Sequence, residues 1–316
     1  MRVISLFSGA GGLDLGLIQA GHQVVWANDI DKDAVATYKR NIGPHITCAD
    51  IGELEDAEFP SADVVVGGFP CQGFSLANRL RSGRDQRNKL YLQFLRVILA
   101  VRPKYFLAEN VRGILSLEGG SAIKRIVKDF SSAGYRVKFK LFNAADFGVP
   151  QTRMRVIIAG TRTDMPKSAD FEFPAPTHSK TPARGELGWI AISQALSGIP
   201  DPELHPNAVP NQGFSKYKVT NRNFTGHRAT DPSKPSPTIL ARGNGGGGVC
   251  AIQHPRNHRR LSVRESAALQ CFPIEFAFEG AMNSQYRQVG NAVPVQFAWA
   301  LGVSLANCEK KLGVVK

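Results

Sequence analysis

The sequence predicts a doubly wound α/β sheet followed by a smaller domain that is rich in loops. From the first residues to about residue 160, short apolar runs alternate with helical stretches, which is typical of such a sheet. After about residue 164 the alternation stops, and eight prolines within residues 166–210 interrupt a polar stretch that cannot continue the sheet. A chain of 316 residues is long enough for one large or two modest domains.

Each expected element follows from its local pattern. Short apolar runs predict strands at residues 3–7, 24–27, 46–47, 64–66, 105–108, 137–142 and 155–159. Helical periodicity predicts helices at residues 13–20, 34–41, 89–101 and 123–133. The same periodicity returns at residues 263–269 and 295–305, and the last of these helices could pack back on the sheet.

Composition narrows the class of protein. The hydrophobic content of 43% fits a soluble globular protein. No segment reaches the roughly 18 consecutive apolar residues of a membrane span, and the first strand begins too early for a signal peptide. The five cysteines lie far apart, without a Cys-x-x-Cys pair or a nearby pair of histidines. We therefore expect a cytoplasmic protein with neither a metal site nor a disulfide framework.

The formal net charge of +13 is concentrated in two segments. Residues 178–264 contain twelve Lys and Arg against four Asp and Glu, a net charge of +8, and residues 79–89 contain five against one, a net charge of +4. Cations among Gly, Asn, Ser and Thr suit a nucleic-acid surface. A solvated basic face explains charge alone equally well.

The most informative motif is the Gly/Pro-rich turn at residues 67–75, which contains Cys71 and directly follows the apolar run at residues 64–66. A cysteine on a tight turn at the end of a strand can meet a substrate and act as a thiolate nucleophile. A packed thiol in an ordinary loop is the alternative.

Glycines and acids at successive strand ends indicate a cofactor site. The glycines of residues 9–12 let the backbone approach a ligand at the carboxyl edge of the sheet. Asp14 stands where a dinucleotide fingerprint needs glycine, so the sequence does not support a nicotinamide or flavin cofactor. Asp29 and Asp31 follow the second strand, where a carboxylate can bind ribose, and Asp50 follows the third, where it can receive an adenine amino group. A ribose site without a pyrophosphate site suggests S-adenosylmethionine.

A carboxyl group and two guanidinium groups are expected near Cys71. Glu109 follows the strand at residues 105–108 and so lies at the same edge of the sheet, where desolvation would favour the protonated form that suits a general acid. Arg153 and Arg155 alternate at the start of a strand and therefore share one face.

Eight motifs, in order along the chain, make the sequence resemble a DNA cytosine-5 methyltransferase of the bacterial restriction-modification type over essentially its whole length. The motifs are residues 7–12 (FSGAGG), 28–31 (NDID), 49–51 (ADI), 68–72 (GFPCQ), 109–111 (ENV), 151–155 (QTRMR), 260–265 (RLSVRE) and 288–293 (QVGNAV). The resemblance implies a Rossmann-like S-adenosylmethionine-dependent methyltransferase domain with a doubly wound mixed sheet, made of residues 1–178 and 283–316. It also implies a loop-rich DNA target-recognition domain at residues 179–282.

The resemblance implies a covalent mechanism. The thiolate of Cys71 would add to C6 of cytosine, so that C5 can attack the methyl group of S-adenosylmethionine, with S-adenosylhomocysteine as product. Glu109 would hold or protonate N3, Arg155 would bind O2, and Arg153 would support Arg155. Because C6 is inaccessible inside a duplex, the target base would be flipped into the pocket. The base that removes the C5 proton is not identified by the sequence.

The resemblance also implies how the cofactor is bound. Phe7 and Ile30 would sandwich the adenine ring, and Asp29 would bind the ribose. The complete set of expected cofactor-binding residues is Phe7, Gly9, Gly11, Gly12, Asp29, Ile30, Asp50, Ile51, Leu90, Asn291 and Val293.

Double-stranded DNA is the implied macromolecular partner. The basic loop at residues 73–89 would close over the DNA, and Thr238 would grip its backbone near the target base. The main chain of Phe69 and Pro70 would face the exocyclic amine of that base. The residues expected to contact DNA are Phe69, Pro70, Gln72, Ser75, Arg87, Thr238 and Arg242. The enzyme would be a monomer that associates with the nucleoid and pairs functionally with a cognate restriction endonuclease.

Two departures and two alternatives remain. Cys271 stands where glycine is usual, and Asp29 stands where glutamate is common but should retain ribose binding. A tRNA cytosine-5 methyltransferase shares the catalytic domain, but the long, basic, Gly-rich recognition segment argues for duplex DNA. A catalytically silent DNA-binding relative or a restriction partner is disfavoured by intact Cys71, Glu109 and Arg155. The DNA sequence that is recognised does not follow from the chain.

Overall fold

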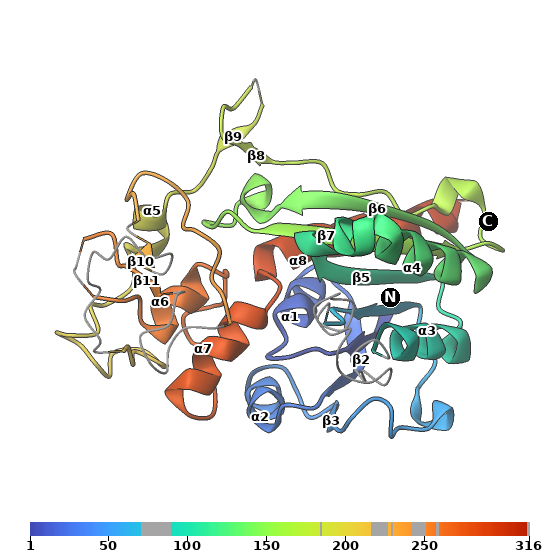
Figure 1. The fold of residues 1–316 in the computed structure, drawn as a ribbon, viewed down its shortest axis with the longest axis horizontal. Helices are drawn as coiled ribbons and strands as arrows, with labels where there is room; N and C mark the ends of the chain where they lie inside the picture. Colours follow the sequence, from blue (N-terminus) through green and yellow to red (C-terminus); the bar gives the residue numbers. More distant parts are fainter. Residues whose placement is uncertain are drawn as a thin grey trace.

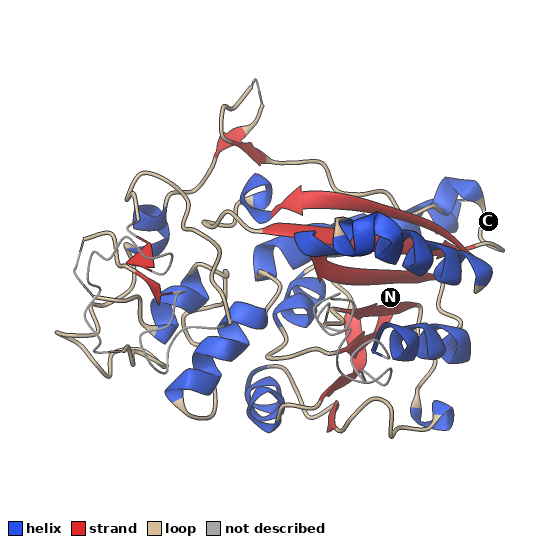
Figure 2. Cartoon of the chain, in the orientation of Figure 1, coloured by secondary structure: helices blue, strands red, loops and turns tan. Residues whose placement is uncertain are grey.

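The computed structural model describes residues 1–70, 90–183, 185–215, 227–228, 230–241, 251–256 and 259–314. These residues form two lobes (Figure 1). One lobe is a seven-stranded sheet with helices on both faces, and the other consists mainly of loops with short helices and strands (Figure 2). The first lobe is the doubly wound α/β sheet that the sequence predicts.

The sheet is mostly parallel. Its strands are β1 (Arg2–Leu6), β2 (Gln23–Asp29), β3 (Ile46–Cys48), β4 (Val64–Gly67), β5 (Tyr105–Val111), β6 (Tyr135–Asn143) and β7 (Met154–Arg162). They lie in the order β3-β2-β1-β4-β5-β7-β6, in which the first five are parallel and β7 is antiparallel to both β5 and β6. The strand order reverses between β1 and β4, and ligands of such folds bind at the carboxyl ends of strands at this switch point.

Five helices bury the two faces of the sheet. They are α1 (Gly12–Gln19), α2 (Lys32–Asn41), α3 (Leu90–Val101), α4 (Ser121–Ser132) and α8 (Val295–Val314). In β4, Val64 and Val66 face a core shared with α1, α2 and α8, whereas Val65 faces a second core shared with α3 and α4. Because both of its faces are buried, this central strand is continuously apolar. Short 3₁₀ helices lie in the connections: η1 (Asp56–Glu58), η4 (Arg112–Leu115), η5 (Leu117–Gly120), η6 (Ala144–Phe147) and η7 (Lys167–Ala169).

The strands and helices predicted for this lobe are confirmed, with differences at their ends. The helix α8 extends well beyond the predicted end at residue 305. The strand β5 continues past residue 108 because its last residues pair with β7, with Glu109 opposite Ile157 and Val111 opposite Arg155. Glu109 therefore lies inside a strand, not after it.

The second lobe has its own hydrophobic core. Its regular elements are α5 (Ile192–Leu196), β10 (His227–Arg228), β11 (Ala251–Ile252), α6 (Val263–Ala268) and α7 (Met282–Asn291). The short strands β8 (His178–Ser179) and β9 (Leu187–Gly188) lie in the connection between the lobes, where the N–H of Thr177 donates to the carbonyl of Asp146 in η6. Three aromatic rings, those of Phe272, Phe276 and Phe278, lie at the centre of the second lobe's core with centroids 4.7 Å to 5.1 Å apart. Tyr286 and Val289 of α7 join the same core, while Gln288 of α7 accepts from the hydroxyl of Thr37 of α2 at 2.6 Å, so α7 packs against both lobes.

One long apolar helical segment is part of the core. Residues Met282–Leu312, which comprise α7 and most of α8, contain an 18-residue window with a mean hydropathy of 1.3, which is long and apolar enough to cross a membrane by length and composition. However, 67% of the apolar window is buried within the fold, where α8 packs along α1. This burial explains the apolar composition of α8 as that of a core helix.

Cys271 has a left-handed backbone conformation, with φ of +61°. Only glycine adopts this conformation without steric cost. The geometry fits the expectation that glycine is usual at this position, and it marks Cys271 as a locally strained residue. Burial raises the pKa of its thiol to about 12, so the thiol is protonated at neutral pH.

Candidate active site

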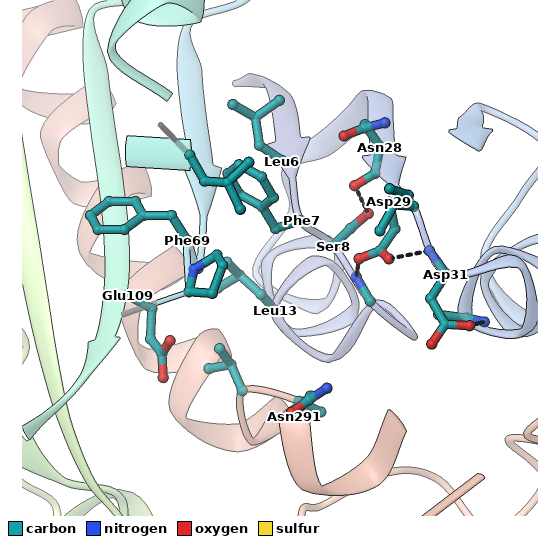
Figure 3. Close-up of a pocket in the computed structure, with 18 of the residues that line it drawn as sticks. Leu6, Phe7, Ser8, Leu13, Asn28, Asp29, Asp31, Phe69, Glu109 and Asn291 are labelled. Carbon is teal, nitrogen blue, oxygen red and sulfur yellow. Dashed lines mark hydrogen bonds between the residues drawn. The ribbon is translucent and has the colours of Figure 1, made fainter. Parts of the chain in front are cut away.

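A cavity of about 500 Å³ opens at the carboxyl ends of the parallel strands (Figure 3). Its walls come from the turns after β1, β2 and β3, from the loop after β4, from the end of β5 and from residues 288–293. The cavity therefore lies at the switch point of the sheet, where the sequence places both the acids and the catalytic candidates.

The turn after β1 is held by hydrogen bonds to the end of β2. The main-chain N–H of Gly9 donates to Oδ2 of Asp29 at 2.7 Å, and the hydroxyl of Ser8 donates to the carbonyl of Asn28 at 3.0 Å. Phe7 has a φ of +54°, a left-handed conformation that is strained for a bulky residue, and it lines the cavity. The hydrogen bonds to β2 hold this strained turn in place.

Two of the three predicted turn glycines pack against protein instead of lining the cavity. Gly9 lines it, but Gly11 and Gly12 do not. A Cβ on Gly11 would lie 2.2 Å from Cδ1 of Ile42, and one on Gly12 would lie 2.5 Å from the carbonyl oxygen of Val293. These two glycines allow α1 to begin in close contact with α2 and with the segment after α7.

Carboxylates at two strand ends face the cavity. The two oxygens of Asp29 accept the N–H groups of Gly9 at 2.7 Å and Asp31 at 2.8 Å. Burial raises the pKa of Asp29, and these two hydrogen bonds oppose the rise. Asp50 is exposed at the rim, where its Oδ1 accepts the N–H of Gly52 at 2.9 Å. Each carboxylate oxygen can accept a further hydrogen bond from a ligand hydroxyl or amino group.

Apolar side chains lie beside these carboxylates. Ile30 is 65% exposed, although it is a large aliphatic residue, and it lines the cavity together with Phe7. Ile51 lines it as a buried residue, and Leu90 and Val293 lie along it from α3 and from the segment between α7 and α8. An apolar slot next to carboxylates matches the chemistry of an adenine ring attached to a ribose. Asn291, the last residue of α7, also lines the cavity (Figure 3).

Sequence reasoning missed several lining residues. They are Leu6, Ser8, Leu13, Asn28, Ala34, Ala49, Gly68, Asn110, Val111, Gln288, Gly290 and Ala292. Most belong to, or adjoin, the motifs already identified, and that adjacency is the signal that could have found them. Ala34 carries no such signal, because only the packing of α2 brings it to the cavity.

Glu109 and Arg155 form an ion pair in the cavity wall. Nε of Arg155 lies 2.5 Å from Oε1 of Glu109, and their side chains are 11% and 14% exposed. Nη1 of Arg155 also donates to the carbonyl of Met154 at 2.8 Å. The structure thus brings together two of the predicted catalytic groups on neighbouring strands.

Asn110 fixes the loop that leads to Cys71. Its Nδ2 donates to the carbonyl of Phe69 at 3.0 Å, and its Oδ1 accepts the N–H of Val111 at 2.9 Å. The ring of Phe69 is buried in the core against Phe94, with centroids 5.8 Å apart. Phe69 and Pro70 line the cavity, and the core position of the Phe69 ring fits the expectation that its main chain serves the site.

Arg153 is buried and binds main-chain carbonyls. Its side chain donates to the carbonyls of Ile239 at 2.8 Å, Gly290 at 2.9 Å and Ala292 at 3.0 Å. Burial, together with the charge of Arg155, lowers the pKa of Arg153 well below its ordinary value. Although Arg153 lines the cavity with Arg155, its guanidinium is engaged by three main-chain carbonyls from two segments of the chain.

The predicted DNA-contacting residues fall into two groups. Thr238 is described: its hydroxyl donates to the carbonyl of Thr152 at 2.6 Å, and it does not line the cavity. The others beyond Phe69 and Pro70, together with the predicted nucleophile, lie outside the described residues: Cys71, Gln72, Ser75, Arg87 and Arg242.

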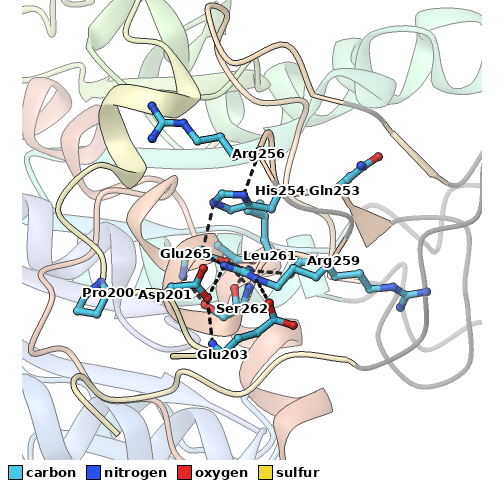
Figure 4. A network of polar contacts seen from close by, with 12 residues as sticks. Pro200, Asp201, Glu203, Gln253, His254, Arg256, Arg259, Leu261, Ser262 and Glu265 are labelled. Carbon is cyan, nitrogen blue, oxygen red and sulfur yellow. Dashed lines mark hydrogen bonds and ion pairs between the residues drawn. The ribbon is translucent and has the colours of Figure 1, made fainter. Parts of the chain in front are cut away.

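The motif at residues 260–265 contributes to a buried charged network in the second lobe (Figure 4). Glu265 accepts hydrogen bonds from both Nη atoms of Arg259 at 2.8 Å, and from the N–H of Ser262 at 2.7 Å. Nε2 of His254 lies 3.6 Å from the same carboxylate, and burial lowers the pKa of His254. The network joins the start of α6 to the residues that follow β11. The motif at residues 260–265 therefore stabilises the second lobe.

Comparisons with known proteins agree with this geometry. The family described as "C-5 cytosine-specific DNA methylase" matches residues 1–307 of the chain. The Type II methyltransferase M.NgoFVII of Neisseria gonorrhoeae is 39% identical, over 96% of this chain and 86% of that protein. The Type II methyltransferase M.BspRI of Lysinibacillus sphaericus is 37% identical, over 96% of this chain and 81% of that protein.

A solved structure shares the whole fold. A putative DNA modification methyltransferase encoded within an E. coli prophage superposes with a TM-score of 0.74 at 25% identity. The match covers 98% of this chain and 99% of the other. Both lobes are therefore part of the shared architecture.

Proposed function

The chain belongs to the family of C-5 cytosine-specific DNA methylases, and from this premise we propose how it acts. It transfers a methyl group from S-adenosylmethionine to C5 of a specific cytosine in double-stranded DNA, and S-adenosylhomocysteine is the product. The target base is flipped out of the duplex into the cavity, and Cys71 attacks its C6. Residues 179–282 serve as the target-recognition domain, and residues 1–178 with 283–316 serve as the catalytic domain.

The position of the Glu109–Arg155 pair carries this proposal. Pro70, which directly precedes Cys71, lines the same cavity as both members of the pair. On a cytosine ring N3 and O2 are neighbours, so a carboxyl and a guanidinium that touch each other can contact both at once. This edge recognition leaves the C5–C6 side of the ring for the thiolate and the methyl donor.

The chemistry requires activation of the ring, because C5 of cytosine is a poor nucleophile. The Cys71 thiolate forms a bond to C6, and the electron pair of the C5–C6 double bond becomes available at C5. Arg155 stabilises negative charge at O2, while Glu109 holds or delivers a proton at N3. When bound, S-adenosylmethionine supplies an electrophilic methyl carbon. Loss of the C5 proton then restores the C5–C6 double bond and expels the Cys71 thiolate.

The residues at the first two strand ends fit this cofactor. The exposed side chain of Ile30 and the ring of Phe7 offer apolar surfaces for adenine, and Asp29 offers carboxylate oxygens for the ribose hydroxyls. Asp50 and Asn291 offer polar groups at the rim of the same cavity. The donor set needs no metal ion.

Labelled methyl transfer tests the proposed reaction. The wild-type protein is incubated with methyl-labelled S-adenosylmethionine and either unmethylated plasmid or bulk tRNA. We expect label in the plasmid and none in the tRNA, and bisulfite sequencing then maps the modified cytosine. Label in tRNA alone, or in neither, would contradict the proposal.

A mechanism-based trap tests the nucleophile. A duplex with 5-fluorocytosine at the mapped position should form a covalent adduct in the presence of S-adenosylmethionine, because fluorine cannot leave as a proton does. Cys71→Ser should form no adduct. An adduct that persists in this variant would show that another residue attacks C6.

The restriction-modification role is tested in cells. The relatives are named Type II methyltransferases, so we propose that methylation protects DNA from a cognate endonuclease. Plasmid from expressing cells should resist an endonuclease that cuts at the mapped site, and plasmid from cells that express Cys71→Ser should be cut. Size-exclusion chromatography with light scattering tests the proposed monomer.

A further inference from the structure

Three buried polar side chains, those of Gln151, Arg153 and Gln270, join two segments that the proposed function assigns to different ligands. Residues 238–241 belong to the lobe proposed to contact DNA. Residues 290–293 line the cavity proposed to hold the cofactor. The hydrogen bonds between these segments are therefore a physical connection between two binding sites.

Both the N–H and the carbonyl of Ile239 are held by side chains from the segment directly before β7. Its N–H donates to Oε1 of Gln151 at 2.8 Å, and its carbonyl accepts from Nη1 of Arg153 at 2.8 Å. Next to it, the hydroxyl of Thr238 donates to the carbonyl of Thr152 at 2.6 Å. This segment cannot move relative to β7 without breaking buried hydrogen bonds, and unmade buried bonds are costly.

The same side chains hold the cofactor-site segment. Nη2 of Arg153 donates to the carbonyl of Ala292 at 3.0 Å, and Nε2 of Gln270 donates to the same carbonyl at 3.1 Å. Oε1 of Gln270 accepts from Nε2 of Gln151 at 2.9 Å. These hydrogen bonds form a closed ring that begins and ends at Ile239. A displacement of any residue in the ring therefore changes the hydrogen bonds of the other residues.

The two segments also touch directly at Gly290. Its carbonyl accepts from Nη2 of Arg153 at 2.9 Å, and a Cβ at this position would lie 2.3 Å from the main-chain nitrogen of Ala241. No larger residue fits there without a shift of backbone. Because of this contact, neither segment can move without displacing the other.

We infer that Arg153 is a positioning residue that couples DNA binding to cofactor binding. The inference rests on the proposed function, which assigns DNA to one segment and S-adenosylmethionine to the other. A duplex that fixes residues 238–241 also fixes the guanidinium of Arg153, and with it the carbonyls on both sides of Asn291. By thermodynamic linkage, each ligand then raises the affinity for the other by the same factor.

Paired binding measurements test the coupling. The dissociation constant of S-adenosylhomocysteine is measured by titration calorimetry with and without a duplex that contains the mapped site. In the wild-type protein the duplex should tighten binding by about five-fold or more, the lower end of typical coupling. In Arg153→Lys, which keeps the charge but cannot span the three carbonyls, the ratio should fall below about two-fold. The dissociation constant of S-adenosylhomocysteine without DNA serves as the reference for each protein, so the ratio, not the absolute affinity, measures the coupling.

A second variant and a matched control separate coupling from general destabilisation. Gln270→Met keeps the approximate shape and removes the donor to Ala292, so it should lower the ratio as well. Arg264 is also buried and also donates to three main-chain carbonyls, those of Pro210, Pro273 and Phe276, all within the second lobe. Arg264→Lys should therefore cost comparable stability and keep the wild-type ratio.

The outcomes distinguish this inference from the proposed function. A wild-type ratio near one, or an unchanged ratio in both Arg153→Lys and Gln270→Met, would overturn the coupling while methyl transfer to DNA stays intact. A wild-type protein that transfers no methyl group to the same duplex would contradict the proposed function instead. Equal loss of the ratio in Arg264→Lys would also overturn the inference, because it would assign the effect to stability.

Discussion

Nε of Arg155 lies 2.5 Å from Oε1 of Glu109, although the two residues stand on different strands. In the antiparallel pair of β5 and β7, Arg155 is opposite Val111 and Glu109 is opposite Ile157. The two residues are therefore diagonal neighbours on one face of the sheet, close enough for long side chains to meet. Strand register thus sets the distance between the groups proposed to bind N3 and O2.

Glu109→Gln should lower kcat by about 10²-fold to 10⁴-fold, because the amide keeps the shape but cannot deliver a proton at N3. Single-turnover transfer of labelled methyl groups to the mapped duplex measures the effect, and binding of S-adenosylhomocysteine should not change. Glu118→Gln, which alters a more exposed ion pair with Arg125, is the control and should keep full activity. A kcat within a few-fold of wild type would remove Glu109 from the chemistry.

The sequence predicts the sheet lobe well because its elements follow local patterns. The continuously apolar run at residues 64–66 is a buried central strand, and the turns after β1, β2 and β3 meet at one cavity. These features depend on periodicity and on the rule that parallel strands present their carboxyl ends at one edge.

The partners of Arg153 could not be predicted from such patterns. Alternation correctly places Arg153 and Arg155 along one cavity, but the carbonyls that Arg153 binds belong to residues 86 to 139 positions away in the chain. Likewise, the packing role of Gly11 depends on Ile42 of another element. Contacts set by tertiary packing leave no periodic signal in the sequence.

Asn110→Asp should slow the reaction without removing any proposed catalytic group. The substitution replaces the donor to the Phe69 carbonyl with an acceptor, so the loop that carries Cys71 shifts away from Glu109. A misplacement of about 1 Å can cost about 10²-fold in rate, and we expect a loss of about 10-fold to 100-fold in the rate of 5-fluorocytosine adduct formation.

The control for this prediction is Asn41→Asp. Asn41 also donates to main-chain carbonyls, those of Thr37 and Ala277, which belong to α2 and to the second lobe and not to the loop after β4. It should affect stability while the adduct rate stays at the wild-type value. Equal rates for Asn110→Asp and the wild-type protein would show that the hydrogen bond to Phe69 does not position the loop.

Asp14→Asn should raise stability in a pH-dependent way. Burial raises the pKa of Asp14 from 3.8 to about 6, while the hydroxyl of Ser5 at 2.6 Å partly opposes the rise. The folded state binds the proton of the Asp14 carboxyl more tightly than the unfolded state does. The protonated carboxyl therefore makes its full contribution to the free energy of unfolding below pH ~4, and this contribution is lost as pH rises through ~6. The loss corresponds to about 3 kcal/mol at most.

The measurement is urea unfolding of both proteins between pH 4.5 and 8. The variant has no carboxylate to ionise, so its advantage in free energy of unfolding should grow as pH rises to about 6 and then stay constant. A difference that is the same at every pH would mean that Asp14 is not the buried titrating group.

Glu265→Gln should destabilise the second lobe by about 3 kcal/mol, because it leaves the charge of Arg259 buried without its main partner. The side chains of this pair are only 3% and 7% exposed, and the carboxylate receives both Nη atoms of Arg259 at 2.8 Å. Chemical unfolding gives the free energy. Glu279→Gln breaks a pair with Arg40 whose side chains are 39% and 58% exposed, so it should cost less than about 1 kcal/mol. Similar losses in the two variants would mean that Glu265 is not the group that compensates the charge of Arg259, and would assign that role to Asp201 at 3.5 Å or to water.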